Sequence, residues 1–208
     1  KTRQNPAYRL AFFIKLNTMK KLYLLFLIVT SLSYAQVVPG SPEIPTETTP
    51  ITIFFDASGT GLDGYTGDVY AHTGVITTTS TSSSDWKHVI GSWGNNTTQP
   101  KLTRTGSNTY QLAISPDIPA YYGTTTGEVV TDIAIVFRNS AGNTQTSPDI
   151  FIPIYAGGLN ISITNPANES VYDLNDNITI SAASSINADL ELKVNNASVQ
   201  TATNATSI

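Results

Sequence analysis

The chain has 208 residues, with 15 acidic against 11 basic side chains, two histidines and no cysteine. This length allows one or two domains, and a chain without disulfides must be stabilised by core burial, which a domain of about 100 residues can supply. The scarcity of cysteine and histidine excludes zinc-finger and thiol chemistry. Because no basic patch is present, nucleic acid is not expected as a partner.

The amino-terminal part carries the pattern of an exported protein. Met19, the only methionine, opens a basic segment, an apolar run follows over 22–29, and small residues lead to Ala35. The apolar run is too short to span a bilayer and is typical of a signal peptide. We therefore expect residues 1–18 to be leader sequence outside the protein and residues 19–35 to be a signal peptide. The product is then secreted or on the cell surface of a Gram-negative bacterium, with no membrane segment after cleavage.

Residues 36–49 are predicted to form a linker. Prolines stand at positions 39, 42 and 45, with glutamate and threonine between them, and another proline follows at position 50. Such composition is typical of an extended, polyproline-like or disordered segment.

Residues 50–156 are predicted to form an immunoglobulin-like β-sandwich. In the run 68–76, Val69, Ala71 and Val75 fall on one face of an alternating pattern. Residues 119–123 are expected to hold one helical turn. Short strands separated by turn residues at this spacing are typical of a sandwich. The predicted strands are 51–55, 68–76, 86–90, 109–114, 129–138 and 149–155.

A second, incomplete immunoglobulin-like module is predicted over 157–208. The glycines at 157 and 158 indicate a hinge, and strand patterns follow at 159–164, 178–182 and 190–194, with Asn195-Asn196 as a turn. A complete sandwich of this type takes roughly seven strands and about 100 residues. The fold class expected for the whole chain is therefore all-β.

No catalytic, metal or cofactor site is predicted. No two acidic residues of the first module have a spacing that indicates a facing general-acid pair. Calcium would suit the glycine-rich stretch that holds three aspartates, but turn-forming roles are favoured for them because the spacing does not match an EF-hand. The histidines His72 and His88 have no nucleophile beside them, and packing roles are favoured. The acidic residues considered are Asp56, Asp63, Asp68, Asp85, Asp117, Glu128, Asp132 and Asp149.

The aromatic residues are the best candidates for ligand binding. Trp86 and Trp93, the only tryptophans, lie in one segment with basic and amide side chains. Indoles pack on the apolar faces of sugar rings, while amides and charged groups bind hydroxyls. The competing interpretation, which the sequence favours, is that one or both tryptophans pack in the core. The candidate carbohydrate-binding residues are Trp86, Trp93, Lys87, Asn95, Asn96 and Gln99.

Several runs resemble a known group of modules. The segments 51–57 (ITIFFDA), 67–75 (GDVYAHTGV) and 85–94 (DWKHVIGSWG), with 137–139 and 149–155, resemble the amino-terminal sandwich of secreted α-amylase-family glycoside hydrolases of the Bacteroidetes group. The sequence from Leu159 resembles the bacterial immunoglobulin-like module that follows in those enzymes.

The resemblance implies a non-catalytic accessory region of an enzyme that acts on starch or maltodextrin. Its job would be to contact α-glucan or to space a catalytic domain lying downstream in the same chain. In that family the catalytic carboxylates belong to a (β/α)8 barrel of about 250 residues, so none of them is carried over to this sequence. The alternatives are a spacer without a ligand and an adhesin-like or structural immunoglobulin-like repeat protein without an associated enzyme.

Overall fold

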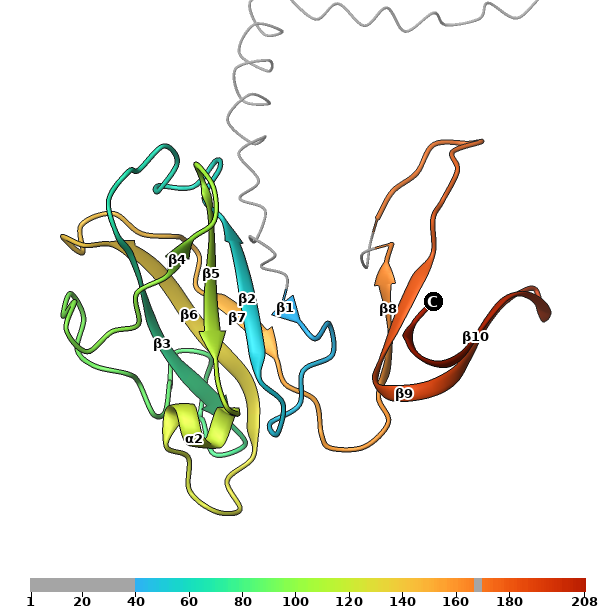
Figure 1. Ribbon diagram of the computed structural model, residues 1–208, viewed down its shortest axis with the longest axis horizontal. Helices are drawn as coiled ribbons and strands as arrows, with labels where there is room; N and C mark the ends of the chain where they lie inside the picture. The colour runs from blue at the N-terminus through green and yellow to red at the C-terminus, as the bar shows by residue number, and fades with distance from the viewer. Residues whose placement is uncertain (1–39, 167–169) are drawn as a thin grey trace, which may run out of the picture. The chain divides into compact units, whose positions relative to one another are not determined.

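The computed structural model describes residues 40–166 and 170–208 (Figure 1). The predicted leader and signal peptide lie outside the described residues. By its contacts the chain divides into residues 1–35 and residues 36–208, and only the second unit is described below. Its strands form three antiparallel sheets, and the described residues contain one short helix, α2 (Ile118–Tyr122). The predicted all-β fold is confirmed.

The first module is a sandwich with the strand order of an immunoglobulin constant-type domain. One sheet has the order β1-β2-β5-β4 and the other the order β3-β6-β7, which match the A-B-E-D and C-F-G sheets of that fold. Figure 1 shows the two sheets packed face to face. The strands are β1 (Gly40–Ser41), β2 (Ile51–Asp56), β3 (Val69–Thr77), β4 (Thr103–Arg104), β5 (Thr109–Ile114), β6 (Val130–Asn139) and β7 (Ile150–Pro153).

The core forms where the alternating inner side chains of both sheets meet. In β2 the residues Ile51, Ile53 and Phe55 are buried, while the residues between them are at least partly exposed. The predicted inner face of β3 is likewise buried, including its Thr73. A period of two with one buried face is what a sandwich strand requires.

The predicted helical turn between β5 and β6 is α2, and its ends explain its position. The Asp117 carboxylate accepts a hydrogen bond from the Ala120 N–H at 2.8 Å, which caps the amino terminus. Gly123 follows the last turn in the left-handed conformation that favours glycine. The turn places the Tyr122 hydroxyl 2.8 Å from the Thr73 hydroxyl in the core, which connects the helix to β3.

Residues 40–49, assigned above to a linker, are part of the sandwich. Gly40 and Ser41 pair with β2 as strand β1. Ile44 is buried at 2% exposure, and the Glu47 carboxylate accepts a hydrogen bond from the Val130 N–H at 2.7 Å. Proline is compatible with the edge of a sheet. The prediction of a linker from the proline content was therefore wrong for residues 40–49, which contain an edge strand and a core residue.

The strand predicted over 86–90 does not form as a regular strand. The segment makes one isolated bridge, between Val75 and Lys87, and a further hydrogen bond from the Ile90 N–H to the Thr73 carbonyl. It is not a regular strand: at its centre His88 has a φ of 49°, in the left-handed region, which interrupts the extended backbone. The segment therefore follows the edge of β3 without extending the sheet regularly.

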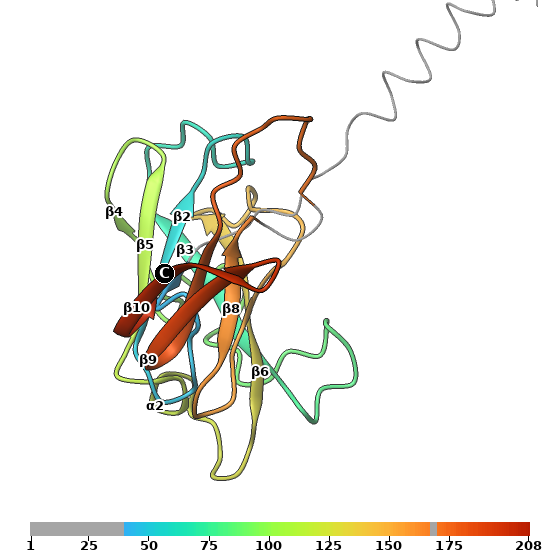
Figure 2. The same ribbon diagram turned by 90° about the vertical axis from the view of Figure 1, so that its right-hand side faces the viewer.

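The second predicted module contains a three-stranded sheet in the order β10-β9-β8, visible in Figure 2. Asn195 and Asn196 both have positive φ and join β9 to β10, as expected for the turn predicted there. The predicted run 190–194 lies within the single long strand β9, whereas the run 178–182 overlaps that strand only at 181 and 182. Strand β10 was not predicted because its threonines, alanines and asparagines lack an apolar pattern. The strands are β8 (Ile161–Asn165), β9 (Ser181–Val194) and β10 (Ala197–Ser207).

Candidate functional site

The candidate site is built on the long connection from β3 to β4, which lies along the free edge of β3. The Val75 N–H donates to the Lys87 carbonyl at 2.9 Å, and the Ala71 N–H donates to the Pro100 carbonyl at 2.8 Å. Gly74 permits this close approach, because a Cβ there would lie 2.8 Å from the Lys87 carbonyl oxygen. The connection therefore delivers its tryptophans to the outer face of the β3-β6-β7 sheet.

Four rings form a continuous row on that outer face, and we call His72, Trp86, Trp93 and Phe151 the aromatic face. The His72 ring lies at the centre: it stacks on Trp86 at a centroid distance of 5.6 Å and meets Trp93 edge-on at 5.1 Å. Trp86 in turn meets Phe151 edge-on at 6.4 Å. Trp93 is 45% exposed and Phe151 38% exposed, while Trp86 is partly exposed. Neither tryptophan is buried in the sandwich core.

A buried polar network holds the aromatic face in place. The Gln99 side chain, only 4% exposed, lies 2.6 Å from the His72 Nδ1 atom and accepts a 2.6 Å hydrogen bond from Arg138 Nε. Arg138 is fully buried and also donates through Nη1 to the Asn96 side chain and to the Asn139 carbonyl, both at 2.8 Å. Its guanidinium lies over the Tyr70 ring, 5.1 Å from the centroid. The network joins β3, β6 and the connecting loop.

The ionisation of this network follows from burial. Desolvation lowers the pKa of His72, the charge of Arg138 lowers it further, and Asp149 acts in the opposite direction. With the amide of Gln99 donating, His72 Nδ1 is the acceptor and the ring is neutral. Desolvation also lowers the pKa of Arg138, whose Nη2 atom has no hydrogen-bond partner among the described residues. The guanidinium stays charged because its ordinary pKa is so high.

The six predicted sugar-binding residues lie in this one connection, but most of their polar groups are already used. The Asn96 side-chain amide donates to the Ser140 carbonyl at 2.9 Å. The Asn95 side-chain oxygen accepts hydrogen bonds from the N–H and the hydroxyl of Thr97 within the same turn. The Lys87 ammonium pairs with Asp85 at 2.8 Å. With Gln99 buried in the network, the surface that the site presents is chiefly aromatic.

Two rings of the aromatic face, His72 and Phe151, were not among the residues predicted for the candidate site. His72 lies on β3 opposite Val136, and Phe151 lies on β7 opposite Ala134, so both project from the outer side of the sheet. The available signal was alternation, since Ile150 and Ile152 on either side of Phe151 are buried. A large ring at the outward position of a strand indicates a surface feature.

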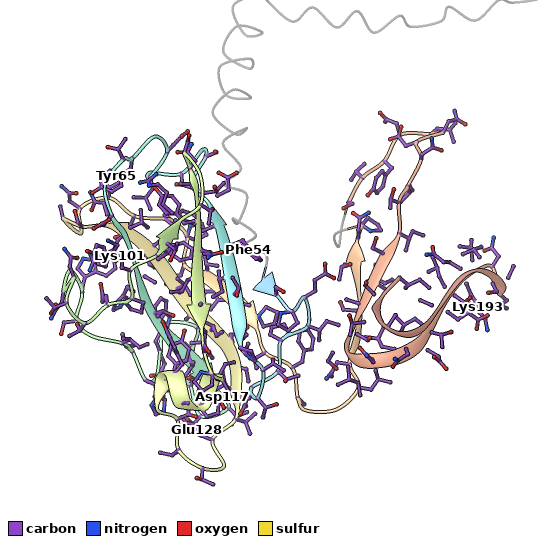
Figure 3. The ribbon with its side chains drawn as sticks, in the orientation of Figure 1. Phe54, Tyr65, Lys101, Asp117, Glu128 and Lys193 are labelled. Carbon is purple, nitrogen blue, oxygen red and sulfur yellow. The ribbon has the colours of Figure 1, made fainter. Side chains whose placement is uncertain are left out.

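The charged side chains of the connection beside the aromatic face are paired. Besides the pair of Lys87 and Asp85, the His88 Nε2 atom lies 2.7 Å from a Glu128 carboxylate oxygen. Glu128 lies near the α2 end of the module (Figure 3). Its pKa is lowered first by a hydrogen bond from the Thr125 N–H and also by His88. The Arg138 guanidinium donates to neutral acceptors only, the side chains of Gln99 and Asn96 and the Asn139 carbonyl. The exposed carboxylate of Asp149 acts electrostatically on His72.

The carboxylates considered above as metal ligands have other partners in the fold. Asp56 accepts from the Ser58 N–H, Asp63 accepts from the Gly59 N–H and from Asn108, and Asp68 pairs with Lys101 at 3.0 Å. Among the described residues, no group of three acidic, histidine or cysteine side chains is arranged to hold a metal ion.

One surface hollow of about 400 Å³ lies where β3 begins beside β4, with Asp68, Lys101 and Arg104 among its lining residues. Figure 3 labels Lys101 beside β3. The Arg104 guanidinium donates to the Tyr65, Gly67 and Ser107 carbonyls, and it lies 4.6 Å from the centroid of the Tyr110 ring. These contacts give Arg104 a structural role in fixing the loop before β3.

No protein-family model and no curated protein matches the chain. The resemblance to amylase-associated modules therefore stays a prediction. In the part of the chain that the structure describes, no helix is long and apolar enough to cross a membrane.

Proposed function

We propose that the sandwich is a non-catalytic module that contacts α-glucan through the aromatic face, as an accessory region of a secreted amylase-family enzyme acting on starch or maltodextrin. The observation that carries the proposal is the exposed indole of Trp93, 45% accessible and in edge contact with His72. A soluble protein that leaves a tryptophan so exposed beside further rings presents a surface suited to a flat, partly apolar partner.

Stacking sets the scale of the interaction. In proteins that bind single-stranded nucleic acid, an aromatic side chain contributes about 1–3 kcal/mol for each base that stacks on it. We take the same scale for a sugar ring. Two such contacts, after the cost of association, give an affinity in about the millimolar range. The rigid network beneath His72 favours binding, because a platform that is already ordered loses little entropy when it meets a ligand.

The acidic residues of the module support a non-catalytic role. Asp117 caps α2, Asp85 pairs with Lys87, and Glu128 is bound to His88 and Thr125. Each of these carboxylates accepts a hydrogen bond at a turn or a helix end, or pairs with a basic side chain of the module. We therefore expect binding of glucan without hydrolysis.

Affinity electrophoresis in gels with and without soluble starch tests the proposal. The parent protein, residues 36–208, is expected to migrate more slowly in starch, and Trp93→Ala is expected to remove the retardation while the protein stays folded. Phe54→Ala is a matched control, because Phe54 is 42% exposed but projects from β2 in the other sheet (Figure 3).

Identical migration of the parent with and without starch would favour the spacer without a ligand. Retardation that survives in Trp93→Ala would place the glucan contact elsewhere. The adhesin-like alternative predicts binding to other surface partners but no effect of starch.

A further inference from the structure

We infer that Phe151 is a further ligand-contacting residue and that the aromatic face takes a neutral oligosaccharide of several sugar units rather than a single sugar. The inference rests on the proposed function. It depends on two observations that the proposal did not use: the order of the ring contacts and the balance of charges around them.

The ring contacts follow one another in a line. Trp93 contacts His72, His72 contacts Trp86, and Trp86 contacts Phe151. The two most exposed rings, Trp93 and Phe151, are thus the ends of the row. If each exposed aromatic face packs against one sugar ring, a ligand that reaches both ends must contain more than one unit.

The two ends of the row come from different parts of the fold. Trp93 belongs to the connection after β3, whereas Phe151 belongs to β7, the edge strand of the β3-β6-β7 sheet. The backbone of Phe151 is held by strand pairing with Ala134, so its position in the fold does not depend on the loop. A ring carried by a strand at one end and a ring carried by a loop at the other form an extended platform.

The charge balance indicates a neutral ligand. Lys87 is paired with Asp85, His88 with Glu128, and His72 is neutral. An acidic glycan would need an unpaired cation for each carboxylate it buries. The one buried cation beneath the face, Arg138, donates to Gln99, Asn96 and Asn139. Its remaining Nη2 atom has no partner among the described residues, but it is itself buried and so is not presented to a ligand at the surface.

The test compares glucose, maltose and maltoheptaose as ligands in chemical-shift titrations of the 36–208 protein. The parent is expected to bind maltoheptaose at least about five-fold more tightly than glucose, as a second stacking contact of about 1 kcal/mol or more requires. Phe151→Ala and Phe151→Leu are expected to lose this advantage, while Phe54→Ala keeps it. The leucine variant preserves apolar volume on the edge strand, so a stability effect of the alanine variant is separated from loss of the ring.

The outcomes separate the two ideas. If the parent binds maltoheptaose and both Phe151 variants keep the full chain-length advantage, the role of Phe151 is overturned while the proposed function stands. If the parent binds none of the three sugars, the proposed function fails and this inference fails with it. Tighter binding of polygalacturonate than of maltoheptaose would overturn the neutral-ligand assignment.

Discussion

Phe55 of β2 and Phe137 of β6 stack across the sandwich, with ring centroids 4.3 Å apart and an interplanar angle of 28°. Their strands occupy the B and F positions of the immunoglobulin order, the pair that a disulfide joins in antibody domains. Both rings are buried, at 1% and 0% exposure. In this cysteine-free chain the inter-sheet connection is an aromatic stack, extended by Tyr110, which lies 5.8 Å from Phe55.

Replacing one ring of the stack should destabilise the module strongly. Phe137→Ala removes a fully buried ring and leaves a cavity between the sheets, so we expect the free energy of unfolding to fall by about 3–5 kcal/mol. Urea unfolding followed by circular dichroism measures the change. The exposed Phe54 is the control, and its alanine variant should change stability by less than about 1 kcal/mol. Equal losses in the two variants would show that the stack is not a central contact.

Most of the sandwich was predictable because its strands bury one face. The predicted run 109–114 has the bounds of β5. The run predicted for β2 differs from the strand by one residue at one end, and the runs predicted for β3 and β6 differ by one residue at each end. Two strands were missed because pattern cannot identify them: β1 and β4 have two residues each, too few for alternation to appear.

The candidate site was only partly predictable. The two tryptophans marked the correct connection, but which of its polar groups are free depends on contacts far apart in the sequence. Gln99 bonds Arg138, 39 residues away, and His72, 27 residues away. No local pattern shows that an amide will be buried beneath a histidine. Phe151 joins the site only through the pairing of β6 and β7.

Residues 40–49 should contribute measurably to stability. A fragment of residues 40–156 contains Ile44 and Glu47, and a fragment of residues 50–156 lacks both. Without the Glu47 carboxylate the Val130 N–H loses its acceptor, and without Ile44 a fully buried side chain is missing. We expect the shorter fragment to be less stable by about 2–5 kcal/mol. Thermal unfolding of both fragments compares their midpoints. Equal midpoints would show that residues 40–49 do not stabilise the sandwich and act only as a linker.

The Gln99 side chain should be required for an ordered aromatic face. Gln99→Leu leaves Arg138 Nε without its acceptor and removes the partner of His72 Nδ1. We expect a loss of about 1–3 kcal/mol in the free energy of unfolding and faster amide exchange over residues 86–98. Gln145→Leu is the matched control, because the Gln145 side chain is exposed. Unchanged exchange in Gln99→Leu would mean that the loop is ordered by its backbone contacts alone.

The stability of the module should depend on the protonation of His72. Burial and the Arg138 charge lower its pKa from the ordinary 6.5, so below pH 6.5 the unfolded chain binds the proton before the folded one. The contribution of neutral His72 to the free energy of unfolding is therefore fully present above pH 6.5. It is lost as the pH drops from 6.5 through the lowered pKa.

His72→Asn keeps an acceptor for Gln99 but does not titrate. Urea unfolding of the parent and the variant at several pH values between about 7.5 and 5 isolates the histidine. Glu128 and Asp85, whose lowered pKa values start from 4.5 and 3.8, titrate below this window. Parallel curves for the two proteins would contradict the prediction.

Residues 157–208 taken alone should not unfold cooperatively. The three-stranded sheet leaves Leu159, Ile161 and Ile163 55%, 60% and 64% exposed, and the buried residues among its described part are Ala183, Ser184 and Leu190. This small apolar burial cannot offset the backbone entropy of ordering some 50 residues, about 1–2 kcal/mol for each. Differential scanning calorimetry of the isolated fragment should show no transition, whereas the fragment of residues 40–156 should show one sharp transition. A sharp transition in the 157–208 fragment would mean that its sheet has a core of its own, and the prediction of an incomplete module would be wrong.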